Sequence, residues 1–433
     1  MDVEPASTPV RRRQPGKRLQ ARVFACLLLV AVLPAWGANR GSKTHTERAV
    51  WRSWLRHRAH LRYLAHLRYL AHLRYLRRLR ARRARHEAWL HHLRLEREGY
   101  IYGGQVWTTS PVAYHLSAHD LTAGEDPVVR AAAVRALGNR NGTAVVVNPN
   151  DGRILAMVNQ RLALSSSYQP CSTTKLAIAV AALNSGLINE NTPVRLPNGS
   201  RVNLTHALAY SVNAYFETVG RRLGFRTVSD YERMLGLGRR VGFEIRGESP
   251  GIYPLAPPEN GGVAKLCSFG EGIYITPLQL ASLVSTIANG GTIYYLQHPT
   301  TAWQAQHFHP RVRLQMKLSA ITPEIEDGMM AAVHYGTARG ARVRGINILG
   351  KTGTCSRGTT RYGLFASYMG VQNPRLAVVV VLRGNHLVYG PLAAAIAGRI
   401  YRSLDRQGYF EQRGWLAQNR PSAGRALRRS RRR

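Results

Sequence analysis

Ser172 and Lys175 are the residues whose types and spacing most directly suggest chemistry. They precede an apolar run, 176–183, which predicts a helix that begins after Pro170 and ends at 184–186. Residues three apart share a helix face, so the lysine amine can reach the serine hydroxyl. An amine that burial keeps partly neutral can take the serine proton, and N–H groups at the helix start can stabilise an oxyanion. The pattern therefore predicts nucleophilic acyl transfer.

Two further motifs strengthen this interpretation. Ser211-Val212-Asn213 follows the apolar residues 207–210, and Lys351-Thr352-Gly353-Thr354 follows the strand-like run 346–350. Only six of the 61 basic residues are lysines, yet two of the six lie in these motifs. Arginine could not replace Lys175 as a base, because a guanidinium does not lose its proton in a protein. The three motifs together indicate a serine–lysine site assembled from distant segments.

The order S-x-x-K, S-x-N, K-T-G is the active-site set of penicillin-binding proteins and serine β-lactamases. The chain resembles the transpeptidase domain of monofunctional, class B-like penicillin-binding proteins over about residues 118–405, without their usual pedestal domain. The resemblance implies a serine-type D,D-transpeptidase, which cross-links peptidoglycan stem peptides through an acyl-enzyme and binds penicillin covalently. Its substrates would be stem peptides ending in D-Ala-D-Ala, and β-lactams would be its inhibitors.

The resemblance also implies the catalytic roles. Ser172 would be the acylated nucleophile, with Lys175 as its base. Ser211 would relay a proton to the leaving amine, and Lys351 would set the local potential and orient Ser211. The backbone N–H groups of Ser172 and Thr354 would form the oxyanion hole.

Substrate binding is implied for a second group of residues: Asn213, Lys351, Thr352, Gly353 and Thr354. Asn213 would hold the peptide amide of the substrate, and Thr352 and Thr354 would bind its terminal carboxylate. Gly353 is expected to be small so that a substrate strand can lie along this sheet edge. No cofactor or metal is expected.

Three alternatives remain open. A D,D-carboxypeptidase would share every motif and differ only in using water as the acceptor. A β-lactamase would need a base for deacylation, and no suitable glutamate follows Lys175. A β-lactam-sensing or scaffold protein is disfavoured by the intact motif residues. The sequence does not decide the acceptor, nor a role in elongation, division or sporulation.

The pattern of elements predicts an α+β fold of the β-lactamase/transpeptidase type. Two strands, 143–147 and 153–158, precede the Ser172 helix, and three more strands, 346–354, 363–371 and 376–382, follow it. Helices are expected at 128–137, around 204–222 and 228–235, from 275 onward, and at 391–404. We therefore expect a central antiparallel five-stranded sheet with helices on both faces.

The chain is strongly basic, with a net charge of +38, and the excess is densest at its two ends. Such ends suit anionic surfaces, while the absence of a groove-reading motif argues against nucleic acid. We expect five parts: a basic n-region at 1–22, a signal peptide or membrane anchor at 23–38, a basic low-complexity helical region and linker at 39–117, the transpeptidase domain at 118–405, and a basic tail at 406–433.

These parts predict attachment to the cell inner membrane, with the catalytic domain in the periplasm. Whether segment 23–38 is cleaved stays open. The repeat Ala59–Leu64 recurs at 65–70 and 71–76, and its leucines recur every three residues, so they wind round a helix. That helix is either a basic surface for the membrane or a partner, or a solvated spacer. A SEDS-type membrane glycosyltransferase is the partner that the family implies.

Four cysteines stand at positions 26, 171, 267 and 355. Cys171 and Cys355 flank two motifs that are expected to be neighbours, so a disulfide between them is one alternative. No disulfide framework is implied by three cysteines outside the apolar segment. Buried free thiols are the state that we expect.

Overall fold

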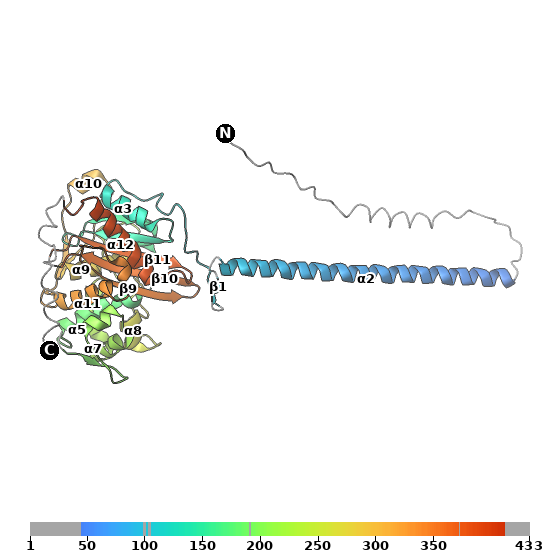
Figure 1. The fold of residues 1–433 in the computed structure, drawn as a ribbon, viewed down its shortest axis with the longest axis horizontal. Helices are drawn as coiled ribbons and strands as arrows, with labels where there is room; N and C mark the ends of the chain where they lie inside the picture. Colours follow the sequence, from blue (N-terminus) through green and yellow to red (C-terminus); the bar gives the residue numbers. More distant parts are fainter. Residues whose placement is uncertain (1–44, 98–100, 103–104, 190–191, 372, 412–433) are drawn as a thin grey trace. The chain divides into compact units, whose positions relative to one another are not determined.

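The computed structural model describes residues 45–97, 101–102, 105–189, 192–371 and 373–411. The chain divides into two compact units, Met1–Ala88 and Trp89–Arg433, which are described separately (Figure 1). The predictions for the n-region and the apolar segment 23–38, and for most of the basic tail, lie outside the described residues. Within the described residues, no helix combines the length and the apolar character needed to cross a membrane.

The repeat region forms one helix, α2 (His45–Arg97), of 53 residues. Its length is roughly 80 Å at the rise of an ideal α-helix. Of the six leucines in the repeat, Leu61, Leu64 and Leu67 are exposed, at 52%, 36% and 42%, and the other three are half-buried. Their three-residue spacing distributes apolar side chains round the helix, so no single face of α2 is apolar. The helix itself is as predicted.

The unit Trp89–Arg433 contains the five-stranded antiparallel sheet that the sequence predicted, and its strand order is β4-β3-β11-β10-β9. The strands are β3 (Gly142–Val147), β4 (Ile154–Val158), β9 (Ile348–Arg357), β10 (Thr360–Met369) and β11 (Leu376–Gly384). Among the strands that the structure describes, β9 pairs with β10 alone, so it is an edge strand whose other side faces away from the sheet. The K-T-G motif therefore lies on a sheet edge.

Successive side chains of a strand point to opposite faces of the sheet, so the core consists of two apolar clusters. In β11, Val378 and Val380 belong to one apolar cluster, whereas Val379 and Val381 belong to the other. Both faces of β11 are buried over residues 376–382, which explains why this part of the strand is a continuous valine-rich run without polar alternation. The β9–β10 ladder is longer than predicted and extends to the pair Arg357↔Thr360, since backbone pairing continues through polar residues.

Helices cover both faces of the sheet (Figure 1). One face packs against α3 (Pro127–Leu137), α12 (Gly390–Arg406) and part of α11 (Thr322–His334). The other packs against a larger set: α4 (Gln160–Ser165), α5 (Lys175–Asn184), α6 (Leu204–Ala209), α7 (Asn213–Met234), α8 (Gly262–Phe269) and α9 (Pro277–Ala288). The predicted fold class is thus confirmed.

Local sequence explains the best-defined helix starts. Asp126 accepts hydrogen bonds from the N–H groups of Val128 and Val129 and so caps α3, whose first residue is proline. Thr276 caps α9 in the same way, ahead of Pro277. The shorter elements are β1 (Ile101–Tyr102), β2 (Gln105–Val106), β5 (Val194–Arg195), β6 (Arg201–Val202), β7 (Thr292–Tyr294), β8 (Val312–Gln315), α10 (Ala302–Gln306) and η2 (Arg339–Ala341).

Candidate active site

Ser172 lies in a single 3₁₀ turn, η1 (Cys171–Thr174), which leads directly into α5. The Pro170 carbonyl closes this turn by accepting hydrogen bonds from the N–H and the hydroxyl of Thr173, at 3.1 and 2.5 Å. The prediction of an α-helical first turn around Ser172 was therefore slightly wrong. The spacing argument still holds, because η1 and α5 are continuous and bring Lys175 over Ser172.

The Lys175 amine is the centre of the site. Its Nζ lies 2.8 Å from Ser172 Oγ, 3.1 Å from Ser211 Oγ and 2.5 Å from Asn213 Oδ1. A fourth contact, of 3.3 Å, joins it to the Ser211 carbonyl oxygen. One fully buried amine thus connects the S-x-x-K motif with both polar residues of the S-x-N motif.

The surroundings of Lys175 lower its pKa from 10.5 to about 6. Burial is the main cause, because it penalises the charged form, and the positive charge of Lys351 acts in the same direction. Glu217 opposes this shift. The ring centroids of Phe216 and Phe269 lie 5.7 and 5.9 Å from Nζ, and these rings help to exclude water from the amine. The amine is consequently poised to be a base near neutral pH.

Ser211 and Asn213 lie at the junction between α6 and α7. The expected single helix over 204–222 is interrupted there, because Ser211 has a φ of 58°. This left-handed conformation costs a non-glycine residue about 1–3 kcal/mol and is often found at functional sites. Asn213 is the first residue of α7, so the turn and the helix start aim both polar side chains at Lys175.

The K-T-G motif occupies the middle of β9. Lys351 is fully buried, and burial lowers its pKa from 10.5 to about 7. Its amine donates a 3.1 Å hydrogen bond to the Thr352 carbonyl. Among the described residues, no hydrogen bond joins Lys351 to Ser211, and the role of Lys351 in orienting Ser211 stays a prediction. Lys351 acts on Lys175 through its charge.

The threonines of this motif have partners that the sequence did not indicate. Thr352 Oγ1 lies 2.7 Å from Thr337 Oγ1, and Thr354 Oγ1 accepts a 2.8 Å hydrogen bond from the N–H of Gly390. Thr337 is a missed site residue, because no local motif marks its position after α11. Its contact with β9 exists only in the folded chain.

Gly353 also packs closely against η1, a contact that the sequence did not indicate. A Cβ at this position would lie 3.2 Å from the Pro170 carbonyl oxygen and from Thr173 Cγ2, and 3.4 Å from Cys171 Cβ. Glycine therefore lets β9 pack closely against η1. The contact brings the K-T-G strand next to the nucleophile.

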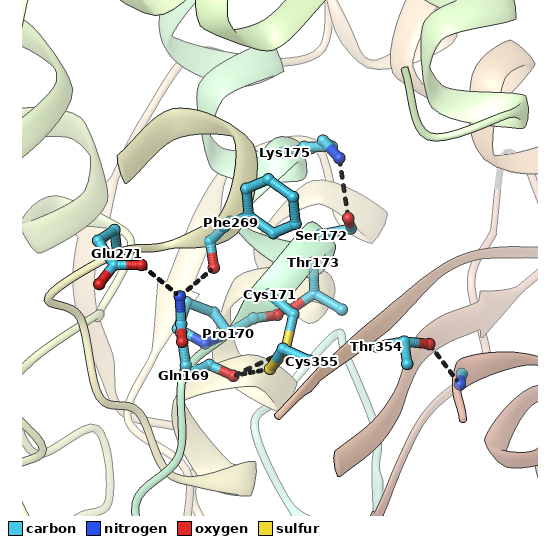
Figure 2. The surroundings of a disulfide bond; sticks show 11 residues. Gln169, Pro170, Cys171, Ser172, Thr173, Lys175, Phe269, Glu271, Thr354 and Cys355 are labelled. Atoms are coloured by element: carbon cyan, nitrogen blue, oxygen red, sulfur yellow. Dashed lines mark hydrogen bonds between the residues drawn. A yellow bond between two sulfur atoms is a disulfide. The ribbon is translucent and has the colours of Figure 1, made fainter. Parts of the chain in front are cut away.

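Cys171 and Cys355 form a disulfide, with their Cα atoms 5.7 Å apart (Figure 2). The expectation of free thiols at these positions is wrong. Close packing of η1 on β9 places the two Cα atoms within the usual range for a disulfide. Cys267 is a buried free cysteine, as expected.

A family model described as "Penicillin binding protein transpeptidase domain" matches residues 142–402. The chain belongs to the penicillin-binding protein transpeptidase family. Stage V sporulation protein D of Bacillus subtilis (strain 168) is 28% identical over 314 residues, which cover 60% of this chain and 48% of that protein. Peptidoglycan D,D-transpeptidase FtsI of Escherichia coli (strain K12) is 26% identical over 341 residues, which cover 67% and 57%. The chain thus spans about half the length of these curated relatives.

Solved structures agree on the fold. The crystal structure of Pseudomonas aeruginosa PBP2 in complex with WCK 5153 has a TM-score of 0.57 at 24% identity, over 68% of this chain and 79% of that chain. The D,D-transpeptidase domain of a peptidoglycan glycosyltransferase from Eggerthella lenta has a TM-score of 0.53 at 21% identity, over 65% and 82%. The expected family and fold are confirmed.

Proposed function

We propose that this protein is a serine D,D-transpeptidase that cross-links peptidoglycan stem peptides. The observation that carries the proposal is the buried Lys175 amine, which contacts Ser172, Ser211 and Asn213 at once. A neutral amine has two hydrogens and one lone pair. It can donate to Asn213 and to the Ser211 carbonyl while its lone pair accepts the proton of Ser172.

The proposed reaction has two acyl-transfer steps. Ser172 Oγ attacks the carbonyl carbon between the two terminal D-alanines, and its proton passes to Lys175. The peptide C–N bond then breaks, and the leaving amine of D-alanine takes a proton through Ser211. An amine of a neighbouring stem peptide attacks the ester on Ser172, releases the serine with its proton restored, and forms the new cross-link. Backbone N–H groups of Ser172 and Thr354 stabilise the oxyanion in both steps.

Substrate binding follows from the position of β9. An extended peptide can add to the outer side of this edge strand through backbone hydrogen bonds. Asn213 holds the peptide amide, while Thr352 and Thr354 bind the terminal carboxylate. Lys351 is a fully buried residue of β9, and its positive charge favours an anionic substrate. Gly353 keeps this surface close to Ser172, and β-lactams acylate the same serine.

The location and partners proposed for the protein are those of a wall-synthesis enzyme outside the cytoplasm. The Cys171–Cys355 disulfide supports an oxidising compartment, such as the periplasm. The proposed anchor at 23–38 would attach the domain 118–405 to the inner membrane, with α2 between them in the basic region 39–117. A SEDS-type glycosyltransferase would supply the glycan strands.

Release of D-alanine from a synthetic peptide ending in D-Ala-D-Ala tests this function. The full chain is incubated with that peptide, with and without an amine acceptor such as glycine amide, and products are identified by mass spectrometry. A transpeptidase forms the aminolysis product when the acceptor is present. Hydrolysis alone at every acceptor concentration would indicate a D,D-carboxypeptidase, and absence of D-alanine release would contradict both.

A further inference from the structure

The Cys171–Cys355 disulfide lies directly beside the two groups proposed to form the oxyanion hole. Cys171 immediately precedes Ser172, and Cys355 immediately follows Thr354. The two cysteines are 184 residues apart in the chain. The covalent bond therefore joins the two distant peptide segments whose N–H groups must point at one substrate oxygen (Figure 2).

The contact between η1 and β9 depends little on hydrogen bonds. Among the residues that the structure describes, no hydrogen bond links η1 to β9. The surface of β9 toward η1 includes Gly353, which offers no side chain to interlock with the turn. What holds the two elements together is therefore close van der Waals packing and the disulfide.

The turn that carries Ser172 is also under backbone strain. Cys171 has a φ of 51°, a conformation that costs a non-glycine residue about 1–3 kcal/mol. Gln169, two residues before Cys171, donates hydrogen bonds from Nε2 to the Phe269 carbonyl, at 3.1 Å, and to Glu271 Oε2, at 3.3 Å. The strained residue is thus held on its N-terminal side by Gln169 and through its own side chain by Cys355.

We propose that the Cys171–Cys355 disulfide is a positioning element of acylation, which holds η1 against β9 so that the N–H groups of Ser172 and Thr354 converge. This inference rests on the proposed function. It makes the acylation rate depend on the oxidised state of the bridge. A dithiol such as dithiothreitol opens the bridge by a two-electron reduction: the reagent becomes a cyclic disulfide, and each cysteine sulfur gains one proton.

The test compares acylation of the full chain in three forms: the oxidised protein, the protein reduced by dithiothreitol with the excess removed, and the variant Cys355→Ser. Stopped-flow kinetics with a fluorescent penicillin separate the dissociation constant of the first complex from the rate constant of acylation. A thiol count under denaturing conditions rises by two when the bridge opens. Cys267→Ala is the matched control, because Cys267 is the buried cysteine outside the bridge.

We expect the acylation rate constant to fall about 10- to 100-fold without the bridge, the range expected when oxyanion donors are misplaced. The dissociation constant and the far-ultraviolet circular dichroism should change little. Reoxidation by oxidised glutathione, which accepts the two electrons and two protons as it becomes two thiols, should restore the rate of the wild type and of Cys267→Ala, while the rate of Cys355→Ser should not respond to dithiothreitol or to oxidised glutathione.

Two results would overturn the inference. One is an acylation rate constant unchanged in both the reduced protein and Cys355→Ser. The other is a loss of rate that only matches a loss of folded protein, which would make the bridge purely structural. The proposed function fails separately: in that case the oxidised wild type is itself not acylated at Ser172.

Discussion

The pH dependence of acylation follows directly from the state of Lys175, which must be neutral to take the Ser172 proton. With its pKa at about 6, about 9% of the amines are neutral at pH 5 and about 91% at pH 7. The contribution of Lys175 to the rate should therefore rise roughly tenfold between pH 5 and pH 7 and then level off. A fall in the rate above pH 7 would report the loss of charge on Lys351, whose pKa is about 7. A lysine with an ordinary pKa of about 10.4 would give a rate that keeps rising roughly tenfold per pH unit through pH 9.

The charge of Lys351 provides a second part of the same prediction. It is the second cause of the low pKa of Lys175, after burial. In a Lys351→Met variant the pKa of Lys175 should rise, so the midpoint of the profile should move to higher pH. The midpoint is informative even if the variant binds substrate poorly, because it does not depend on the height of the profile.

The assay is the second-order rate constant of acylation by a fluorescent penicillin between pH 4.5 and pH 9.5. Glu232→Gln is the matched control, because burial raises the pKa of Glu232 to about 7 and its ionisation could be mistaken for that of Lys175. We expect the midpoint to be unchanged in this control. A wild-type rate that still rises steeply above pH 8, or a midpoint that moves with Glu232, would refute the role of Lys175 as the base.

Three further predictions concern stability and packing. Lys175→Met should abolish acylation. Between pH 7 and pH 9 the unfolding free energy of the wild type should rise by about 1.4 kcal/mol per pH unit more than that of the variant, because this lysine is protonated there in the unfolded state alone. Urea titrations that give both proteins the same slope of unfolding free energy against pH would contradict the low pKa of Lys175. Glu232→Gln should raise the unfolding free energy by about 1–3 kcal/mol at pH 8 but not at pH 4. The folded wild type holds a buried carboxylate with a raised pKa, which is charged at pH 8 and neutral at pH 4. Equal effects at both pH values would argue against the raised pKa of Glu232. Gly353→Ala should lower both the unfolding free energy, by about 1–3 kcal/mol, and the acylation rate, since its Cβ would press on the Pro170 carbonyl; a wild-type melting temperature and rate would show that β9 and η1 separate easily.

The sequence predicted those parts of the site that depend on local spacing. The approach of Lys175 to Ser172 follows from a three-residue offset at the start of a helix, and the sheet follows from apolar runs such as 376–382. The order of motifs predicted the family, which the match over residues 142–402 confirms. Local pattern was sufficient for each of these.

The remaining features depend on contacts between distant segments. The motif positions allowed a bond between Cys171 and Cys355 as one alternative, but they did not decide between a disulfide and free thiols, because that depends on how closely β9 packs against η1. The left-handed Ser211 interrupts what reads as one continuous helix, and a serine carries no signal for positive φ. Thr337 reaches Thr352 only through the packing of the segment after α11 on β9. Such features become visible only once the folded structure is known.

The most direct test of the central claim is the intact mass of the full chain after exposure to benzylpenicillin, for the wild type and for Ser172→Ala. The wild type should gain the mass of one penicillin, and peptide mapping should place it on Ser172. The variant should gain none while keeping the circular dichroism of the folded wild type. An adduct of equal yield on the variant, or an unmodified wild type, would contradict the assignment of Ser172 as the nucleophile activated by Lys175.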